Sequence, residues 1–197
     1  MTDWFEPLYA AAAAGEAVVP WDSHAASPLL VEWSRGVDGR GRRAIVVGCG
    51  LGDDAAHVAA LGFATVAFDI APTAVAGARR RFPAAPVEWV VADLLDLPPE
   101  WIGAFDLVVE VITVQALPDP PRARAIACVS SLVAPGGMLI VISGARDADD
   151  AVDGPPWPLT RAEVEAFATG GVEAVRIEDL RGQPEPWSWR WRAEFRR

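Results

Sequence analysis

Three glycines follow the first run of β-branched residues, and they form the most specific ligand-binding pattern in the chain. The stretch reads VVGCGLGDDA over residues 46–55, with Gly48, Gly50 and Gly52 in a GxGxG spacing. Glycine allows a tight turn and lets the backbone approach a ligand without an intervening Cβ. In open α/β sheets, ligands bind beyond the carboxyl ends of the strands. The spacing therefore predicts a cofactor-binding turn.

The residue after the third glycine argues against a nicotinamide dinucleotide. A GxGxxG fingerprint requires glycine at the position of Asp53. An acidic side chain at the start of a helix also disfavours a pyrophosphate there. A nicotinamide-dependent oxidoreductase is therefore the weaker alternative for this turn.

Acidic residues stand at the ends of the next three predicted strands. Asp69 lies 21 residues beyond Gly48, close to the distance at which an acidic group meets ribose hydroxyls in such folds. Asp93 could accept from an adenine amine while its apolar neighbours cover the ring. Glu110 ends the fourth strand. Three acids favour an adenosine ligand with a cationic sulfonium or amino group over one with phosphates.

Taken together, these motifs resemble the class I S-adenosylmethionine-dependent methyltransferases. The resemblance covers about residues 44–142 and rests on VVGCGLGDDA, FDIAPTAV, VVADLLDLP, FDLVVEV and LVAPGGMLIVI, in that order. It implies methyl transfer with S-adenosyl-L-methionine as cofactor and S-adenosyl-L-homocysteine as product. The details resemble the small thiopurine, tellurite-resistance and halide/thiol methyltransferases, through Trp4, Pro20–Asp22, Asp69–Ala74 and Pro156–Thr160.

The resemblance also implies a role for each matching residue. It places a turn under the methionine part of the cofactor, one acid at the ribose, a second acid with its neighbour at the adenine, and a third pair near the sulfonium. The turn is Gly48, Cys49 and Gly50, and the acid at the ribose is Asp69, with Ile70 beside it in the cofactor site. The acid and its neighbour at the adenine are Asp93 and Leu94, and the pair near the sulfonium is Glu110 and Val111. An amino-terminal tryptophan helps to cover the cofactor in the narrower group, and Trp21 is the matching position.

The methyl acceptor is expected to be a small, soft or apolar molecule, with a thiol as one candidate. Trp21 and Trp157 offer aromatic contacts for such a molecule, and the sequence has no basic patch. Methyl transfer from a sulfonium mainly requires alignment of the nucleophile, so no catalytic base is assigned. An oxygen or nitrogen acceptor would draw help from Glu110, Asp22 or His24. A non-catalytic protein that binds S-adenosylmethionine is the main alternative.

The charge balance disfavours nucleic acid as a substrate or partner. The chain has 27 acidic and 17 basic residues and a formal net charge of -10. A protein of this charge repels polyphosphates and gains nothing from counterion release. The Asn/Asp-Pro-Pro-aromatic motif of amino-methylating DNA enzymes is also missing after the fourth strand, where Glu110–Thr113 stand.

Metal binding and membrane insertion are not expected either. Cys49 and Cys128 are the only cysteines and lack the spacing of a zinc site. No apolar run reaches the roughly 18 residues of a membrane span, and the amino terminus does not resemble a signal peptide. We therefore expect a soluble cytoplasmic protein without a structural metal.

Short β-branched runs alternate with alanine-rich stretches from residue 44 onward, which predicts βαβ units around a parallel sheet. The five predicted strands, each buried on both faces, are Ala44–Val47, Thr65–Phe68, Val87–Val91, Phe105–Val109 and Met138–Ile142. The predicted helices are Asp53–Leu61, Pro72–Arg81 and Pro121–Val133, the last one stopped by Pro135, Gly136 and Gly137.

The carboxyl-terminal part is predicted to form one helix and an antiparallel hairpin. Thr160 and Glu163 match a capping box, and the helix is expected to run to Ala168. Residues 187–196 alternate aromatic or small residues with polar ones, which is typical of a strand that buries one face. This strand would pair with Val172–Leu180.

The predicted fold class is α/β, a doubly wound Rossmann-like mixed sheet of seven strands with helices on both faces. Five strands would be parallel, and the carboxyl-terminal hairpin would add two antiparallel ones. We expect a single domain over residues 1–197, with residues 1–43 as an amino-terminal helical cap and residues 44–197 as the core.

Overall fold

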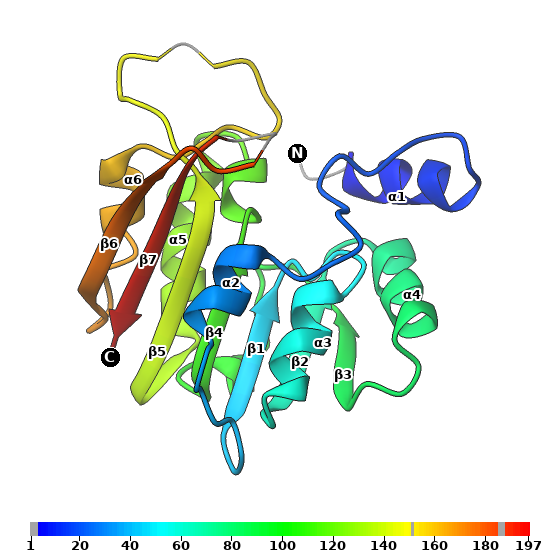
Figure 1. Cartoon of the computed structure of the whole chain (residues 1–197), viewed down its shortest axis with the longest axis horizontal. Helices are drawn as coiled ribbons and strands as arrows, with labels where there is room; N and C mark the ends of the chain where they lie inside the picture. Colours follow the sequence, from blue (N-terminus) through cyan, green and yellow to red (C-terminus); the bar gives the residue numbers. More distant parts are fainter. Residues whose placement is uncertain (1–3, 151, 185–187) are drawn as a thin grey trace. The chain divides into compact units, whose positions relative to one another are not determined.

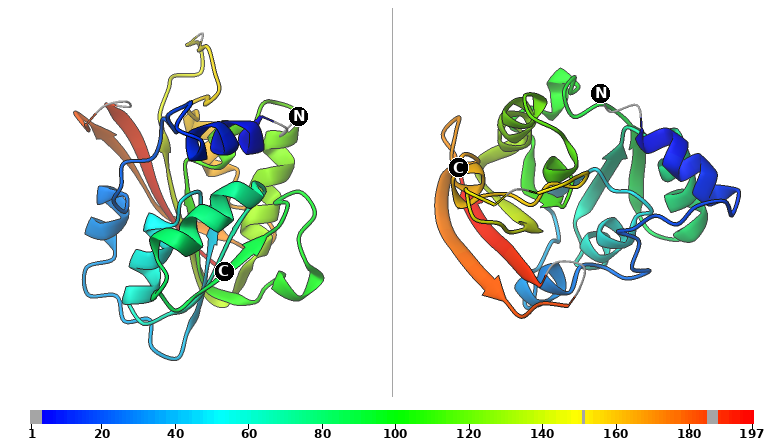
Figure 2. Two further views of the ribbon diagram at one scale, coloured as in Figure 1. Left: turned by 90° about the vertical axis from the view of Figure 1, so that its right-hand side faces the viewer. Right: turned by 90° about the horizontal axis from the view of Figure 1, so that it is seen from above.

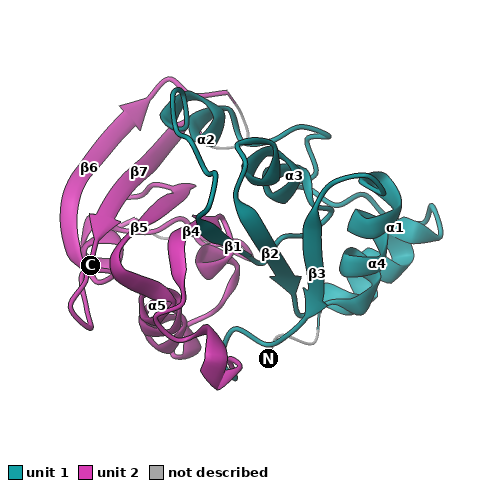
Figure 3. Ribbon diagram, turned by 90° about the horizontal axis from the view of Figure 1, so that it is seen from below, with its two compact units in different colours: residues 1–96 teal, residues 97–197 magenta. Residues whose placement is uncertain are grey.

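The computed structural model describes residues 4–150, 152–184 and 188–197 (Figure 1). The chain divides into two compact units, residues 1–96 and residues 97–197 (Figure 3). Each unit has its own strands and helices and is described by itself. The single-domain organisation over residues 1–197 remains a prediction.

Three parallel strands in the order β3-β2-β1 form the sheet of the first unit. Its elements are β1 (Arg43–Val47), α3 (Asp53–Ala60), β2 (Ala64–Asp69), α4 (Pro72–Arg81) and β3 (Val87–Val91). Strands β1 and β2 are buried along nearly their whole length, as their continuous apolar runs predict. The prediction that β3 is buried on both faces was wrong. Only Trp89 of β3 is buried, because β3 is the edge strand of this unit.

Two helices precede the sheet, in the segment predicted as a helical cap. Helix α1 (Phe5–Ala13) lies beside α4, as Figures 1 and 2 show. Helix α2 (Pro28–Trp33) is held at both ends by α3. The Ser27 backbone N–H donates to Asp54 Oδ1 at 2.7 Å, and Ser34 Oγ lies 2.8 Å from His57 Nε2. Both of these α3 residues therefore have structural roles in fixing the cap.

Four strands in the order β4-β5-β7-β6 form the sheet of the second unit. Its elements are η1 (Pro99–Trp101), β4 (Phe105–Val111), η2 (Val114–Ala116), α5 (Pro121–Ser131), β5 (Val133–Gly144), α6 (Arg161–Glu165), β6 (Glu173–Arg181) and β7 (Trp189–Arg196). Strands β4 and β5 are parallel, whereas β7 runs antiparallel to both β5 and β6. The predicted seven-stranded mixed sheet, with five parallel strands and a carboxyl-terminal hairpin, is therefore confirmed.

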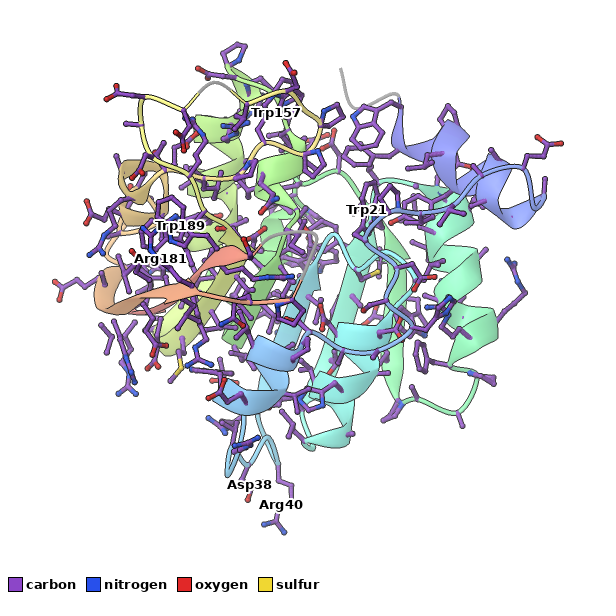
Figure 4. All side chains as sticks on the ribbon, turned by 45° about the horizontal axis from the view of Figure 1, so that its top comes forward. Trp21, Asp38, Arg40, Trp157, Arg181 and Trp189 are labelled. Atoms are coloured by element: carbon purple, nitrogen blue, oxygen red, sulfur yellow. The ribbon has the colours of Figure 1, made fainter. Side chains whose placement is uncertain are left out.

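The hairpin shows the predicted alternation. Trp191, Ala193 and Phe195 of β7 are buried. Trp189 is only half-buried, and its ring lies 3.8 Å from the Arg181 guanidinium carbon on β6 (Figure 4). Trp187, which was predicted to begin this strand, lies outside the described residues.

Three helix ends differ from the prediction. Helix α3 ends at Ala60, one residue before the predicted Leu61. Helix α5 ends at Ser131 rather than Val133, because Val133 already pairs with Phe105 in the sheet. The Pro-Gly-Gly segment expected to stop that helix lies inside β5, where the pairing with β4 shifts register. Helix α6 has the predicted capping box but ends at Glu165, short of Ala168.

Candidate cofactor site

The glycine turn follows β1 and has a backbone that requires glycine. Gly50 and Gly52 have φ angles of 51° and 95°, in the left-handed region. The Cys49 backbone N–H donates to the Phe68 carbonyl at 2.8 Å, which ties the turn to β2. The Cys49 thiol is buried, and burial raises its pKa well above the usual value, as expected of a packing residue.

Asp69 at the end of β2 braces this turn. Its Oδ2 accepts from the Gly50 backbone N–H and its Oδ1 from the Ala71 N–H, both at 2.9 Å. The residue is only 7% exposed, and burial raises its pKa, while the two N–H groups partly oppose that rise. Each carboxylate oxygen has a further lone pair. Asp69 can therefore hold the turn and still accept from the hydroxyls of a ribose.

The other residues predicted at the adenosine lie on the same unit, after β2 and β3. Ile70 is half-buried and follows Asp69 directly. Asp93 Oδ1 accepts from the Leu95 backbone N–H at 2.8 Å, which fixes this carboxylate just after β3. Leu94 is 7% exposed and provides an apolar neighbour. In a parallel sheet the carboxyl ends of neighbouring strands share one edge, so these residues and the glycine turn follow the same edge.

Trp21 reaches this edge through a residue that the sequence analysis did not assign. Its indole Nε1 donates to Tyr9 Oη at 2.9 Å. Tyr9 is 4% exposed, and a Cβ built on Gly50 would lie 2.9 Å from the Tyr9 hydroxyl oxygen. Tyr9 is the only tyrosine of the chain. Its being the only tyrosine was the one feature of the sequence that could have drawn attention to it. Its contacts with Trp21 and Gly50 join residues far apart in the chain and leave no local sequence pattern.

Two further polar contacts that the sequence did not indicate fix the amino-terminal segment over this edge. Glu6 of α1 accepts from the Thr73 backbone N–H at 3.0 Å and from the Thr73 hydroxyl at 2.5 Å. Arg81 of α4 donates to Asp22 and to Asp53 at 2.6–2.8 Å. The Arg81 hydrogen bonds lower the pKa of Asp22. Arg81 therefore joins the segment after Trp21 to α3.

Glu110 and Val111 belong to the second unit, at the end of β4. Glu110 is fully buried, and its Oε1 accepts from the Val114 backbone N–H at 2.9 Å. Burial raises its pKa to about 7. Val111 is half-buried and pairs with Ile142 of β5. Ile112, next in the chain, has a φ of 66°, a strained conformation for a β-branched residue that is concentrated at functional sites.

Buried polar atoms gather on one face of β4 and β5. Glu110 pairs with Val141, so Ser143, two residues further along β5, points to the same face. Gln115 of η2 accepts from the Gly144 backbone N–H at 2.6 Å through its Oε1. Among the described residues no partner is found for Glu110 Oε2, Gln115 Nε2 or Ser143 Oγ. Natural proteins rarely leave such atoms unsatisfied, which marks this face as a place for a polar ligand or ordered water.

Within residues 4–150, 152–184 and 188–197, no three His, Cys, Asp or Glu side chains are grouped so as to hold a metal ion. In the same part of the chain, no helix has the length and apolar character needed to cross a membrane.

Comparison with known proteins finds similarity to methyltransferases. Residues 44–137 match the family model described as methyltransferase domain. The solved structure of the N-methyltransferase NodS from Bradyrhizobium japonicum with S-adenosylhomocysteine has a TM-score of 0.67, at 23% identity over 85% of this chain and 83% of that one. A second solved structure comes from work on the conversion of a disulfide bond into a thioacetal group during echinomycin biosynthesis. Its TM-score is 0.76, at 24% identity over 100% of this chain and 91% of that one. Over residues 44–137 the chain is therefore similar to methyltransferase domains, and it shares its fold with these solved structures.

Two curated relatives share part of their sequence with this chain. Thiocyanate methyltransferase 1 of Arabidopsis thaliana is 28% identical over 169 residues, which is 83% of this chain and 73% of the relative. Ubiquinone biosynthesis O-methyltransferase of Xanthomonas axonopodis is 36% identical over 121 residues, or 60% of this chain. This chain spans about half the length of that O-methyltransferase.

Proposed function

We propose that the protein transfers a methyl group from S-adenosyl-L-methionine to a small, soft nucleophile, with a thiol or a thiocyanate-type sulfur as the preferred acceptor. The observation that carries this proposal is the similarity to thiocyanate methyltransferase 1, which extends over 83% of the chain. The other curated relative is more identical but matches a shorter segment.

The residues at the edge of the first unit fit the proposed cofactor. Asp69 would accept from the ribose hydroxyls, Asp93 would lie at the adenine with Leu94, and the Gly48–Gly50 turn would face the methionine part. When bound, the cofactor supplies a methyl group activated by its sulfonium. The chain's own contribution is to hold the turn through Asp69 and to cover it with Tyr9 and Trp21, so that the ligand is oriented and water is excluded.

The electrostatics of Asp22, one of the three possible bases, favour a sulfur acceptor. Asp22 is a weak proton acceptor, because its hydrogen bonds with Arg81 lower its pKa. The His24 side chain is 77% exposed, and its Nδ1 lies 3.7 Å from Asp22 Oδ2. A thiol has a pKa of about 8.5 and supplies its anion near neutral pH without a strong base. This chemistry makes few demands on the protein beyond alignment.

The formal net charge of -10 disfavours nucleic acid as the methyl acceptor. A cytoplasmic location also remains a prediction. An oxygen acceptor such as a phenol is the second candidate, because the ubiquinone biosynthesis O-methyltransferase is 36% identical over the segment it shares.

Cofactor binding is tested by calorimetry with S-adenosylhomocysteine. We expect micromolar affinity for the wild type and at least a tenfold loss for Asp69→Ala, since that carboxylate both braces the turn and meets the ribose. Asp38→Ala is the matched control. Asp38 lies in the loop before β1 and pairs with Arg40 (Figure 4), so its affinity should stay within twofold of the wild type.

The acceptor is then tested by following formation of S-adenosylhomocysteine with a thiol, with thiocyanate and with a phenol. Faster turnover with the two sulfur compounds supports the proposal, and turnover with the phenol alone would replace it by the O-methyltransferase. Tight cofactor binding without turnover of any acceptor would instead indicate a non-catalytic binding protein. Failure of the wild type to bind S-adenosylhomocysteine would contradict the proposal at its first step.

A further inference from the structure

Among the described residues of the second unit, three buried side chains have polar atoms without a protein partner. Glu110 and Gln115 are 0% exposed, and Ser143 is 1% exposed. The atoms without a partner are Glu110 Oε2, Gln115 Nε2 and Ser143 Oγ. An unsatisfied buried polar atom costs free energy, so native proteins give nearly every such atom a partner. We call these three side chains the buried polar cluster.

The register of the sheet brings the members of this cluster toward one another. Glu110 of β4 pairs with Val141 of β5, and Ser143 is the next residue of β5 on the same face. Diagonal neighbours on one face of a sheet lie about 7–8 Å apart, within reach of a long side chain. The Gln115 amide is held beside Ser143, because its Oε1 accepts from the Gly144 backbone N–H at 2.6 Å. The three groups are therefore neighbours that make no direct hydrogen bond with one another.

The existing hydrogen bonds define what each atom of the cluster can offer. A backbone N–H can only donate, so Gly144 fixes Oε1 of Gln115 as the acceptor and leaves Nε2 as a donor. Glu110 Oε1 accepts from the Val114 N–H at 2.9 Å. Glu110 Oε2 is therefore an acceptor when the carboxyl is ionised and a donor when it is neutral. The Ser143 hydroxyl can donate or accept.

Water is the partner that fits this combination of donors and acceptors. A water molecule both donates and accepts, and in a polar protein interior it makes about three hydrogen bonds. A metal cation would be opposed by the amide N–H of Gln115, and an anion by the ionised carboxylate of Glu110. The burial of all three side chains also leaves no exposed surface for a larger molecule to contact.

We propose that one ordered water molecule binds among Glu110 Oε2, Gln115 Nε2 and Ser143 Oγ and joins the carboxyl ends of β4 and β5. The same water fixes the end of a loop, because the Gln115 backbone carbonyl accepts from the Trp157 N–H at 2.7 Å. Gln115 thereby links both strands to Trp157. The inference rests on contacts within the second unit and is independent of the proposed function.

A high-resolution crystal structure of the ligand-free wild type tests the water site directly. We expect a density peak at about 2.7–3.2 Å from at least two of the three atoms. Two substitutions at one position form a matched pair. Ser143→Ala removes the hydroxyl but leaves two partners for the water, so the peak should persist. Ser143→Val removes the hydroxyl and adds methyl groups where the water binds, so the peak should be lost.

Amide hydrogen exchange tests the link to the loop. In Ser143→Val the Gln115 side chain loses its water partner. The amides of Gly144 and Trp157, which donate to Gln115, should therefore exchange about tenfold faster than in Ser143→Ala. The amides of β6 are the internal reference and should exchange alike in the two variants.

Three results would overturn the inference. A wild-type structure with a direct hydrogen bond between Ser143 and Glu110 and no peak would show that the side chains satisfy one another. A peak too strong for water would show that the cluster binds another molecule or ion. Equal exchange at Gly144 and Trp157 in both variants would show that the water does not hold Gln115. Thermal melting checks that both variants fold, and if Ser143→Val does not, the wild-type and Ser143→Ala structures still decide whether the water is bound.

Discussion

At the residue scale, Gly52 is constrained both by its backbone and by the core behind it. Its φ of 95° disfavours any side chain, and a Cβ there would lie 2.6 Å from Trp89 Cη2 and 2.9 Å from Ala78 Cβ. Both neighbours belong to the packed interior of the first unit. The third glycine of the GxGxG spacing therefore serves close packing of helix against strand, whereas Gly50 faces the ligand side.

We expect Gly52→Ala to lower the free energy of unfolding by about 2–5 kcal/mol, as the sum of left-handed strain and overpacking. Gly41→Ala is the matched control. Gly41 also has a positive φ, 75°, but nothing lies within 4 Å of its added Cβ. It should therefore cost only about 1–2 kcal/mol. Urea denaturation measures both, and equal losses would contradict the packing argument.

Single residues also show what sequence reasoning can and cannot reach. The glycine turn and Asp69 were predicted because their spacing follows from the fold itself. Tyr9 was missed because its role depends on a hydrogen bond to Trp21, twelve residues away, and on contact with Gly50. No periodic pattern in the sequence predicts either contact. The residue-by-residue assignment of cofactor contacts remains a prediction.

At the element scale, α1 depends on α4 for its place. A helix of nine residues is marginal in isolation. Helix α4 in turn has Ala71 at its N-cap and no side-chain cap of its own. The Glu6 carboxylate supplies this missing acceptor at Thr73, near the positive end of the α4 dipole. One carboxylate thus caps α4 and anchors the helix that carries Tyr9.

We expect Glu6→Ala to loosen α1 without unfolding the sheet. Amide hydrogen exchange of residues 5–13 should become at least fivefold faster, because losing a capping carboxylate costs about 1 kcal/mol. The control is Glu16→Ala, an exposed residue just after α1. Its exchange should match the wild type. Unchanged exchange in Glu6→Ala would mean that the apolar cluster around Tyr9 suffices to hold the helix.

The predicted bounds of helices and strands are correct where the hydrophobic periodicity and the capping residues indicate the same element. They are wrong where the pairing of strands determines where an element ends. Helix α4 and strand β3 have the predicted bounds, and the α6 capping box is present. The end of α5 was misplaced, because the pairing of Val133 with Phe105 extends β5 past the Pro-Gly-Gly segment. Strand β3 was expected to be covered on both faces. Its apolar residues do not reveal that it lies at an edge.

At the scale of the whole molecule, two groups of carboxyls respond to pH in opposite directions. The pKa of Glu110 is raised to about 7 and that of Asp54 to about 6, both mainly by burial. The pKa values of Asp22 and Glu163 are lowered, with hydrogen bonds from arginine among the causes. A raised pKa means that the folded state binds the proton more tightly than the unfolded chain does, and a lowered pKa means the reverse.

The two groups together predict that the free energy of unfolding is largest near pH 4. The raised carboxyls contribute fully below about pH 4, and this contribution is lost as the pH rises through 6 and 7. The lowered carboxyls contribute fully above about pH 4, and theirs is lost as the pH falls further. Chemical denaturation at low protein concentration measures the profile, since the sequence pI of 4.6 favours association near the maximum.

Glu110→Gln isolates the largest part of the decline above pH 5. The shift of its pKa corresponds to an upper bound of about 3 kcal/mol between pH 5 and pH 8. Glutamine keeps an oxygen for the Val114 N–H but does not ionise, so this variant should show a much flatter profile and be more stable than the wild type at pH 8. The exposed Glu100→Gln should retain the wild-type slope. If Glu110→Gln retained that slope as well, the side chain would be ionised at no cost. A counter-charge or water at its second oxygen would then have to provide the compensation.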